Sequence, residues 1–290
     1  MIKTAVIGAS GYIGSHLFQR YREKHSNCVG TSFSNNKSDL IRFDLRNQDI
    51  KPLNLEKTGH EAVIIASAKS NISYCENSTQ DAFKVNVEGT LNFIESLSKT
   101  SMKIIFLSTD YVFDGIEGNF DDDHLTAPTT VYGRHKKFVE DEIEGLTDNF
   151  LVLRLSKIYG LRKGDKTILD EAANLLTQDK QVLAASDQYF CPTCIDDLIN
   201  SIINIQAENL TGYMNVCSPE KWSRYNMFTQ LAKHMGKDLS LVKNINLYDL
   251  AEMKGRPLDT SMICSRLIQE TETRFISLEN AIQKIIKHYP

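Results

Sequence analysis

The 290-residue chain lacks long apolar runs and any strong excess of charge. No apolar run approaches the roughly 20 residues that a bilayer-spanning helix needs. The formal net charge of -4 gives no general attraction to nucleic acid or to an anionic membrane. Residues 1–8 already have the pattern of a strand, which is not typical of a signal peptide. We therefore expect a cytoplasmic protein that binds neither membranes nor nucleic acid.

The chain also lacks a second ligand pair for a metal site. Its six cysteines are scattered, and without a secretion signal we expect them to be reduced. Cys191 and Cys194 have CxxC spacing, but no other CxxC and no HxxxH pair accompanies them. We predict incidental thiols, with a redox or metal role as the alternative. The run Asp121-Asp122-Asp123 is interpreted as a solvated acidic loop, with a cation site as the alternative. The sequence thus predicts no metal.

What the chain does have is an alternation of strands and helices. The apolar pattern predicts strands at residues 3–8, 27–33, 62–66, 103–108 and 150–155. It predicts helices at residues 12–21, 80–98, 131–144, 168–176, 196–205 and 278–288. Such alternation is typical of an α/β, doubly wound parallel sheet (a Rossmann fold), which binds ligands at the carboxyl ends of its strands. We expect a Rossmann domain at residues 1–160, to which residues 186–215 return, and mainly a smaller α/β substrate-binding lobe at residues 161–290.

A glycine-rich string follows the first predicted strand: Gly8-Ala9-Ser10-Gly11-Tyr12-Ile13-Gly14. Gly8 permits a tight turn, Gly11 permits close approach of a pyrophosphate, and Gly14 permits close packing of helix on sheet. The helix that begins there presents N–H groups and a positive dipole end to phosphate. The strand–turn–helix context favours a dinucleotide site over a bare glycine turn. We predict that the first domain is NAD(P)-binding, with cofactor contacts from Gly8, Ser10, Gly11, Tyr12, Ile13 and Gly14.

The region after the second predicted strand bears on the type of dinucleotide. A site that prefers NAD often has Asp or Glu there, on the ribose 2′-hydroxyl. Residues 31–37 contain no carboxylate, and Lys37 is available to approach a 2′-phosphate. We therefore favour NADP(H) over NAD(H); the alternative is that Lys37 is only a solvated loop lysine.

Tyr132 and Lys136 are spaced i, i+4 on a predicted helix, so they share one face. A nearby ammonium stabilises tyrosinate and suits the tyrosine to general acid–base work. Helices also carry such pairs by chance. Thr109 supports a catalytic interpretation of Tyr132 and Lys136. It follows the predicted strand 103–108, at the edge where such sheets place catalytic groups. Thr109 is a candidate to hydrogen-bond a carbonyl oxygen; the alternative for residues 108–110 is a capping or turn role.

With these residues in place, the chain resembles an extended short-chain dehydrogenase/reductase, and within that class the dTDP-4-dehydrorhamnose reductase family. The resemblance spans nearly the whole chain. The matching positions are Gly8 to Gly14, Ser108 to Gly115, Pro128, Tyr132-Gly133, Lys136, Arg154, Tyr159-Gly160, Asp187-Gln188, Pro192-Thr193 and Arg256-Pro257, with Cys75-Glu76 and Asn86 also in place. The run Ser-Thr-Asp-Tyr-Val-Phe is the most specific part. It has Tyr111 where sugar-nucleotide dehydratases typically show glutamate.

The resemblance implies a mechanism and a set of site residues. NAD(P)H would deliver a hydride to the C4 ketone of a nucleotide-linked 4-keto-6-deoxy sugar, Tyr132 would protonate the oxygen, and Thr109 would orient the ketone. Lys136 would tune Tyr132 and hold the nicotinamide ribose. The further cofactor residues that the resemblance implies are Asp44 and Leu45 at the adenine and Ala66, Ser67 and Ala68 at the other edge. The implied substrate-binding residues are Thr109, Asp110, Tyr132 and Lys157.

The chain departs from the family pattern at three places. Lys157 stands where the family often has a tryptophan against the sugar, so a cation replaces an aromatic ring. Ile65-Ala66-Ser67-Ala68 replaces an Asn-Ala-Ala-Ala run, and Phe190-Cys191 displaces a glycine. These departures leave the fold prediction unchanged and leave the sugar open.

Three functions remain open at this level. The first is a keto-sugar-nucleotide reductase that acts on a nucleotide-sugar substrate, with a homodimer as a further expectation. The second is another sugar-nucleotide enzyme of the same fold, such as an epimerase. The third is a non-catalytic partner, because the resemblance extends to the regulatory beta subunit of methionine adenosyltransferase.

Overall fold

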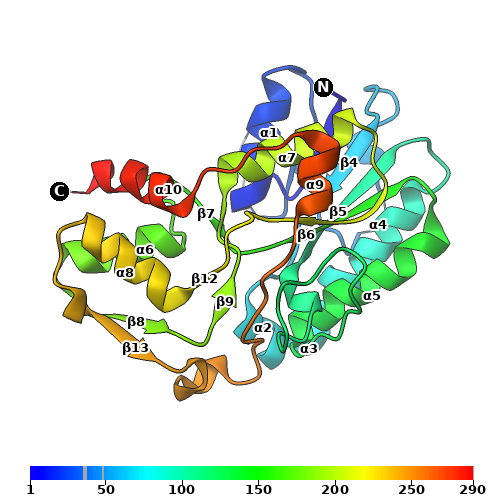
Figure 1. Cartoon of the computed structure of the whole chain (residues 1–290). Coiled ribbons are helices and arrows are strands. Elements are labelled where there is room, and N and C mark those ends of the chain that lie inside the picture. The colour runs from blue at the N-terminus through cyan, green and yellow to red at the C-terminus, as the bar shows by residue number, and fades with distance from the viewer. Residues whose placement is uncertain (35–37, 48, 290) are drawn as a thin grey trace. The chain divides into compact units, whose positions relative to one another are not determined.

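The computed structural model describes residues 1–34, 38–47 and 49–289. The chain forms two compact units, each assembled from separate stretches of sequence (Figure 1). The first unit contains residues 1–112, 130–154 and 202–214, and the second contains residues 113–129, 155–201 and 215–290. Within the described ranges, no helix has both the length and the apolar character needed to cross a membrane.

A five-stranded parallel sheet forms the centre of the first unit. Its strand order is β1-β4-β5-β6-β11, and the bounds are β1 Thr4–Ile7, β4 Ala62–Ile65, β5 Lys103–Thr109, β6 Phe150–Leu155 and β11 Gly212–Val216. Every residue of β1, β4, β5 and β6 is buried, as expected for parallel strands covered on both faces. The register pairs Thr4 with Ala62 and Ala62 with Lys103. The predicted Rossmann fold is confirmed.

The second predicted strand is much shorter than expected. Residues 27–33 were predicted to be a strand, whereas β2 is only Thr31–Ser32, which pairs with β3 Ile41–Arg42. One bridge, from Val6 to Gly30, joins this region to β1. The ladder stops there because the Val29 N–H donates to His60 Nε2, at 3.1 Å, instead of to a neighbouring strand.

The helices of the first unit cover the sheet. α1 Tyr12–Arg22 follows β1 directly, while α4 Thr90–Leu97 and α5 Val131–Leu146 run beside each other (Figure 1). Phe93 and Ile94 of α4 and Val139 and Ile143 of α5 enter the apolar core with the strand residues. This burial positions the face of α5 that carries Tyr132 and Lys136.

The predicted helix at residues 80–98 is divided into three parts. α3 Thr79–Phe83 and α4 are joined by a π-helical segment, Lys84–Gly89, and α2 Ile72–Asn77 precedes them. The Asn86 amide explains the widened turn, because its oxygen accepts from the Lys69 N–H and its nitrogen donates to the Lys69 carbonyl. Asn86 thereby ties this segment to the chain that leaves β4.

The second unit has its own apolar core, and its own strands, within the residues that the structure describes, form two-stranded ladders. Its strands are β7 Ile158–Tyr159, β8 Val182–Ala185, β9 Tyr189–Phe190, β10 Thr193–Cys194, β12 Trp222–Ser223 and β13 Val242–Ile245. Its helices are α6 Ile168–Thr177, α8 Arg224–His234, α9 Ser265–Thr271 and α10 Leu278–Ile285, and α7 Ile195–Ala207 begins there and ends in the first unit. Its short 3-10 turns are Leu239–Leu241, Leu247–Asp249, Ala251–Met253 and Ile286–His288, while the first unit has Lys51–Leu53 and Asp110–Val112. Apolar faces of α6, α8 and α10 pack together in its core.

Candidate active site

The glycine string forms a tight turn between β1 and α1. Gly8 has φ +91°, and a Cβ there would lie 2.7 Å from the Ser67 backbone nitrogen. A Cβ on Gly14 would lie 2.2 Å from the Gly8 carbonyl oxygen, so α1 packs directly on the turn. Gly11 is the N-cap of α1, and its Cβ would meet only the Gly8 carbonyl oxygen, at 3.4 Å. The turn is therefore closed at Gly8 and Gly14 and open at Gly11, which fits a pyrophosphate against the helix N-terminus.

A pocket of about 320 Å³ lies in the first unit. One of its lining residues is Ser67, which packs against Gly8 of the turn. The pocket brings together four of the predicted cofactor residues, which come from the loops after β3 and β4. They are Asp44, Leu45, Ser67 and Ala68, and the other lining residues are Phe33, Phe43, Arg46, Lys69, Asp81 and Val85. The pocket combines apolar walls with charged groups, as an adenosine site requires.

Arg46 is a cation in this pocket that the sequence reasoning missed. Its guanidinium binds Asp44 in a forked ion pair, with Nε–Oδ1 at 3.0 Å and Nη2–Oδ2 at 2.7 Å. This hydrogen bonding lowers the pKa of the Asp44 carboxyl. The guanidinium also lies 5.4 Å above the Phe33 ring, just after β2. Lys37, which was predicted to approach a 2′-phosphate, lies outside the described residues.

Thr109 and Tyr132 meet at the carboxyl end of β5. Thr109 is the last residue of β5 and is only 8% exposed, and its side chain is near enough to that of Tyr132 to affect the pKa of the tyrosine. Its hydroxyl also donates to Asp110 Oδ1 at 3.1 Å. Two hydroxyl groups thus lie together at the edge of the sheet where a Rossmann fold binds its ligand.

Two contacts hold the first turn of α5, which carries Tyr132. Thr130 is the N-cap, and its hydroxyl accepts from the Gly133 N–H at 3.1 Å. Glu76, on α2, accepts from the Val131 N–H at 2.8 Å. A carboxylate at a helix N-terminus is stabilised by the helix dipole. Glu76 was a matching position in sequence, but its capping role appears only in the folded chain.

The pKa of Tyr132 is raised well above its usual value of about 10. Burial is the main cause, and the Asp110 carboxylate raises the pKa further, while the nearby Thr109 side chain lowers it. The structure differs here from the expectation that Lys136 lowers this pKa. The tyrosine accordingly holds its proton in the resting protein, as a proton donor must.

Lys136 is 3% exposed and faces β5 from the same side of α5 as Tyr132. Its ammonium donates to the Leu107 carbonyl at 2.7 Å, lies 4.3 Å from the centre of the Phe106 ring and lies 6.0 Å from that of Tyr132. Burial lowers the pKa of Lys136 to about 7, and the Glu140 carboxylate is the main opposing influence. Burial therefore favours loss of the Lys136 proton, and the Glu140 carboxylate opposes that loss.

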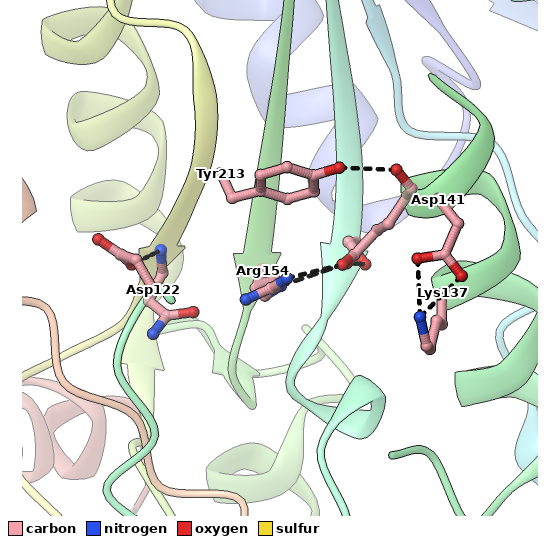
Figure 2. A network of polar contacts seen from close by, with 8 residues as sticks. Asp122, Lys137, Asp141, Arg154 and Tyr213 are labelled. Carbon is pink, nitrogen blue, oxygen red and sulfur yellow. Dashed lines mark hydrogen bonds and ion pairs between the residues drawn. The ribbon is translucent and has the colours of Figure 1, made fainter. Parts of the chain in front are cut away.

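The second unit contains four further residues that the sequence singled out: Lys157, Asp122, Cys191 and Cys194. Lys157, between β6 and β7, is exposed, and its carbonyl accepts from the Thr193 N–H at 2.9 Å. Asp122 accepts from the Asn215 backbone N–H, a contact drawn in Figure 2. Cys191 and Cys194 are buried thiols. Across the part of the chain that the structure describes, no three His, Cys, Asp or Glu side chains are grouped to hold a metal ion.

Together, the parallel sheet, the glycine turn and the Thr109–Tyr132–Lys136 cluster define a Rossmann-type protein of the short-chain dehydrogenase/reductase class. The chain belongs to the RmlD substrate binding domain family, whose model matches residues 2–290. The predicted resemblance to the dTDP-4-dehydrorhamnose reductase family is thereby confirmed.

Several named proteins are similar to this chain over most of its length. A probable low-salt glycan biosynthesis reductase, Agl14, of Haloferax volcanii is 25% identical to this chain. The aligned region covers 87% of this chain and 86% of the relative. A dTDP-4-dehydrorhamnose reductase of Sinorhizobium fredii is 22% identical, with coverage of 84% and 86%. The methionine adenosyltransferase 2 subunit beta of Danio rerio is 20% identical, with coverage of 91% and 84%.

Solved structures share the fold. A dTDP-4-dehydrorhamnose reductase of Bacillus anthracis in complex with NADP has a TM-score of 0.86 at 19% identity and covers 99% of each chain. A dTDP-glucose 4,6-dehydratase of the same organism in complex with NAD has a TM-score of 0.81 at 15% identity, with coverage of 100% and 96%. One architecture thus holds either dinucleotide in these neighbours.

Proposed function

We propose that this protein is an NAD(P)H-dependent oxidoreductase that reduces the C4 ketone of a nucleotide-linked 4-keto-6-deoxy sugar. The observation that carries the proposal is the grouping of Thr109 at the end of β5 with Tyr132 and the buried Lys136, which lie one helical turn apart on α5. The family, and relatives that bear the name dTDP-4-dehydrorhamnose reductase, support the same reaction.

In this proposal the chain's own residues bind, orient and donate a proton. A bound nicotinamide dinucleotide supplies the hydride. The turn from Gly8 to Gly14 and the N-terminus of α1 hold the pyrophosphate, and the pocket around Asp44 and Ser67 holds the adenosine. Thr109 donates a hydrogen bond to the ketone oxygen and so orients it. The Tyr132 hydroxyl transfers its proton to that oxygen as negative charge develops there.

The remaining assignments of the proposal concern Lys136 and the substrate. The Lys136 ammonium holds the nicotinamide ribose. Asp110 and Lys157 contact the substrate. The first unit is the NAD(P)-binding part, and residues 161–290 mainly bind the sugar nucleotide. A homodimer and a cytoplasmic location complete the proposal.

We expect NADPH to bind more tightly than NADH. No carboxylate lies in residues 31–34 to repel a 2′-phosphate, and Arg46 supplies a guanidinium over Phe33. The measurement is the dissociation constant of each cofactor at low and at high salt. Because the preference depends on charge, it is expected to shrink as salt rises. A clearly lower dissociation constant for NADH would contradict this prediction.

The function itself is tested with a panel of nucleotide-linked 4-keto-6-deoxy sugars and NADPH. We expect at least one sugar to cause loss of NADPH absorbance, with one NADPH consumed per alcohol formed. The stoichiometry also separates a reductase from an epimerase, since an epimerase regenerates its cofactor. If no keto sugar in the panel were turned over, the proposal would fail.

The likeness to a methionine adenosyltransferase beta subunit supports a second candidate, a regulatory partner protein. In that case the chain would co-purify in a fixed ratio with a synthetase and turn over no keto sugar. The hydroxyls of Thr109 and Tyr132 beside the buried Lys136 favour the reductase, because a purely regulatory subunit has no need of them.

A further inference from the structure

One face of α5 carries three functional groups in succession: Tyr132, Lys136 and Glu140. Their i, i+4, i+8 spacing aligns them along the helix. Glu140 is 2% exposed, so its carboxylate belongs to the interior of the first unit. A buried carboxylate is costly unless it is paired, and its partners indicate why it is there.

The Glu140 carboxylate binds one group from each of two adjacent strands. Arg154 of β6 donates through Nη2 and Nε to Oε2, at 2.9 and 3.1 Å, and Ser108 of β5 donates its hydroxyl to Oε1. The Arg154 guanidinium also lies 5.2 Å from the centre of the Tyr213 ring, whose hydroxyl donates to the Glu140 backbone carbonyl at 2.8 Å (Figure 2). The helix is thereby fixed to β5, β6 and β11 at this one residue.

Two parallel contacts connect α5 to the catalytic end of β5. Lys136 donates to the Leu107 carbonyl, and one turn further along the helix Glu140 accepts from the Ser108 hydroxyl. The next residue of the strand is Thr109. A shift of α5 along β5 would break both contacts at once and would separate Thr109 from Tyr132.

We infer that Glu140 is a positioning residue, which anchors α5 to β5 through Ser108 and so keeps Lys136, and the end of β5 with Thr109, in register with Tyr132. The inference rests on the proposed function, because it assigns Glu140 a role in that same site. Glu140 acts through Lys136 and Ser108 and is not itself catalytic.

The charged and titratable groups around Lys136 support this role. Among them, the Glu140 carboxylate has the largest effect in raising the pKa of Lys136, and the Cys75 thiol on α2 has a smaller effect in the same direction. Tyr132 lies beside Lys136, and the Asp110 carboxylate raises the pKa of Tyr132. Arg154 is the counterion of Glu140. Loss of the Glu140 charge therefore leaves burial to lower the pKa of Lys136 further.

The test measures the pKa of Lys136 directly by NMR titration of protein with ¹³C-labelled lysine, with the signal assigned by its absence in Lys136→Arg. In Glu140→Gln we expect this pKa to fall by about one pH unit or more. The matched control is Asp141→Asn, which removes the next carboxylate on α5, an exposed one that pairs with Lys137 on the outer face (Figure 2). The control should titrate like the wild type. A folded Glu140→Gln protein with an unchanged Lys136 pKa would overturn the inference.

A second variant keeps the test usable if Glu140→Gln fails to fold. Glu140→Gln/Arg154→Met removes both buried charges, so neither is left unpaired. We expect its Lys136 pKa to lie below that of the wild type, since Glu140 is the dominant opposing charge. An unchanged value in this variant would equally overturn the inference.

The same variants predict a change in the pH profile of reduction. Because only the ammonium form of Lys136 serves the proposed reaction, the alkaline limb of kcat/KM should move to lower pH in Glu140→Gln and stay in place in Asp141→Asn. A uniform loss of activity with no shift of this limb would indicate a merely structural role and overturn the inference. If the wild type reduced no keto sugar, the proposed function would fail, while the NMR titration would still test Glu140.

Discussion

Tyr132→Phe is expected to lower kcat for ketone reduction by about 10²–10⁴-fold and to leave the dissociation constant of NADPH almost unchanged. The substitution removes one oxygen from the side chain, and with it the proton that the proposed reaction transfers. Burial raises the pKa of Tyr132, so the hydroxyl is fully protonated at neutral pH and is a donor in the resting protein. The measurement is steady-state turnover together with fluorescence titration of NADPH binding.

The matched control is Tyr248→Phe. Tyr248 belongs to the second unit, is 43% exposed and donates its hydroxyl to the Arg256 carbonyl. Its loss is expected to leave kcat unchanged, since an exposed hydrogen bond contributes little. If Tyr132→Phe retained wild-type turnover, Tyr132 would lose its role as the acid.

Gly14→Ala is expected to lower the stability of the fold, whereas Gly11→Ala is expected to weaken dinucleotide binding and leave stability almost unchanged. A Cβ on Gly14 would lie 2.2 Å from the Gly8 carbonyl oxygen, so the backbone of the turn must shift, which we expect to cost about 1–3 kcal/mol of folding free energy or more. Gly11 has φ -75° and meets only one atom, at 3.4 Å, so Gly11→Ala should change stability by less than about 0.5 kcal/mol. Its methyl group would instead obstruct the pyrophosphate and weaken dinucleotide binding about tenfold or more.

Urea unfolding and NADPH titration of both variants measure these effects. Gly145→Ala, in the last turn of α5, is the control, because its Cβ would have no neighbour within 4 Å. It should be neutral or stabilise the protein by up to about 1 kcal/mol. If Gly11→Ala bound NADPH as tightly as the wild type, the pyrophosphate would have to bind elsewhere.

The first unit was predictable from sequence where one local signal was sufficient. The strand–glycine–helix order predicted β1, the turn and α1, and apolar periodicity predicted α5 within two residues of its observed end. The π-helical segment at residues 84–89 was not predictable from periodicity, since it depends on the contact of Asn86 with Lys69. The late start of the second strand likewise depends on a distant side chain, His60, which binds the Val29 N–H.

The candidate site was predictable in its residue types and less so in its electrostatics. The i, i+4 spacing placed Tyr132 and Lys136 on one face, and one more turn would have included Glu140. Its partners Ser108 and Arg154 come from separate strands, so their meeting depends on the order β5-β6 in the sheet. The direction of the Tyr132 pKa shift also depended on burial, which spacing alone does not give.

The central claim is that a hydride passes from the dinucleotide to C4 of the sugar. It is tested most directly with NADPH that carries two deuterium atoms at C4 of the nicotinamide ring and a nucleotide-linked 4-keto-6-deoxy sugar that the enzyme accepts. The account predicts a product one mass unit heavier than the unlabelled alcohol, with the deuterium on C4 and the new hydroxyl proton from solvent. A product without deuterium at C4, or a cofactor recovered unoxidised after turnover, would contradict it.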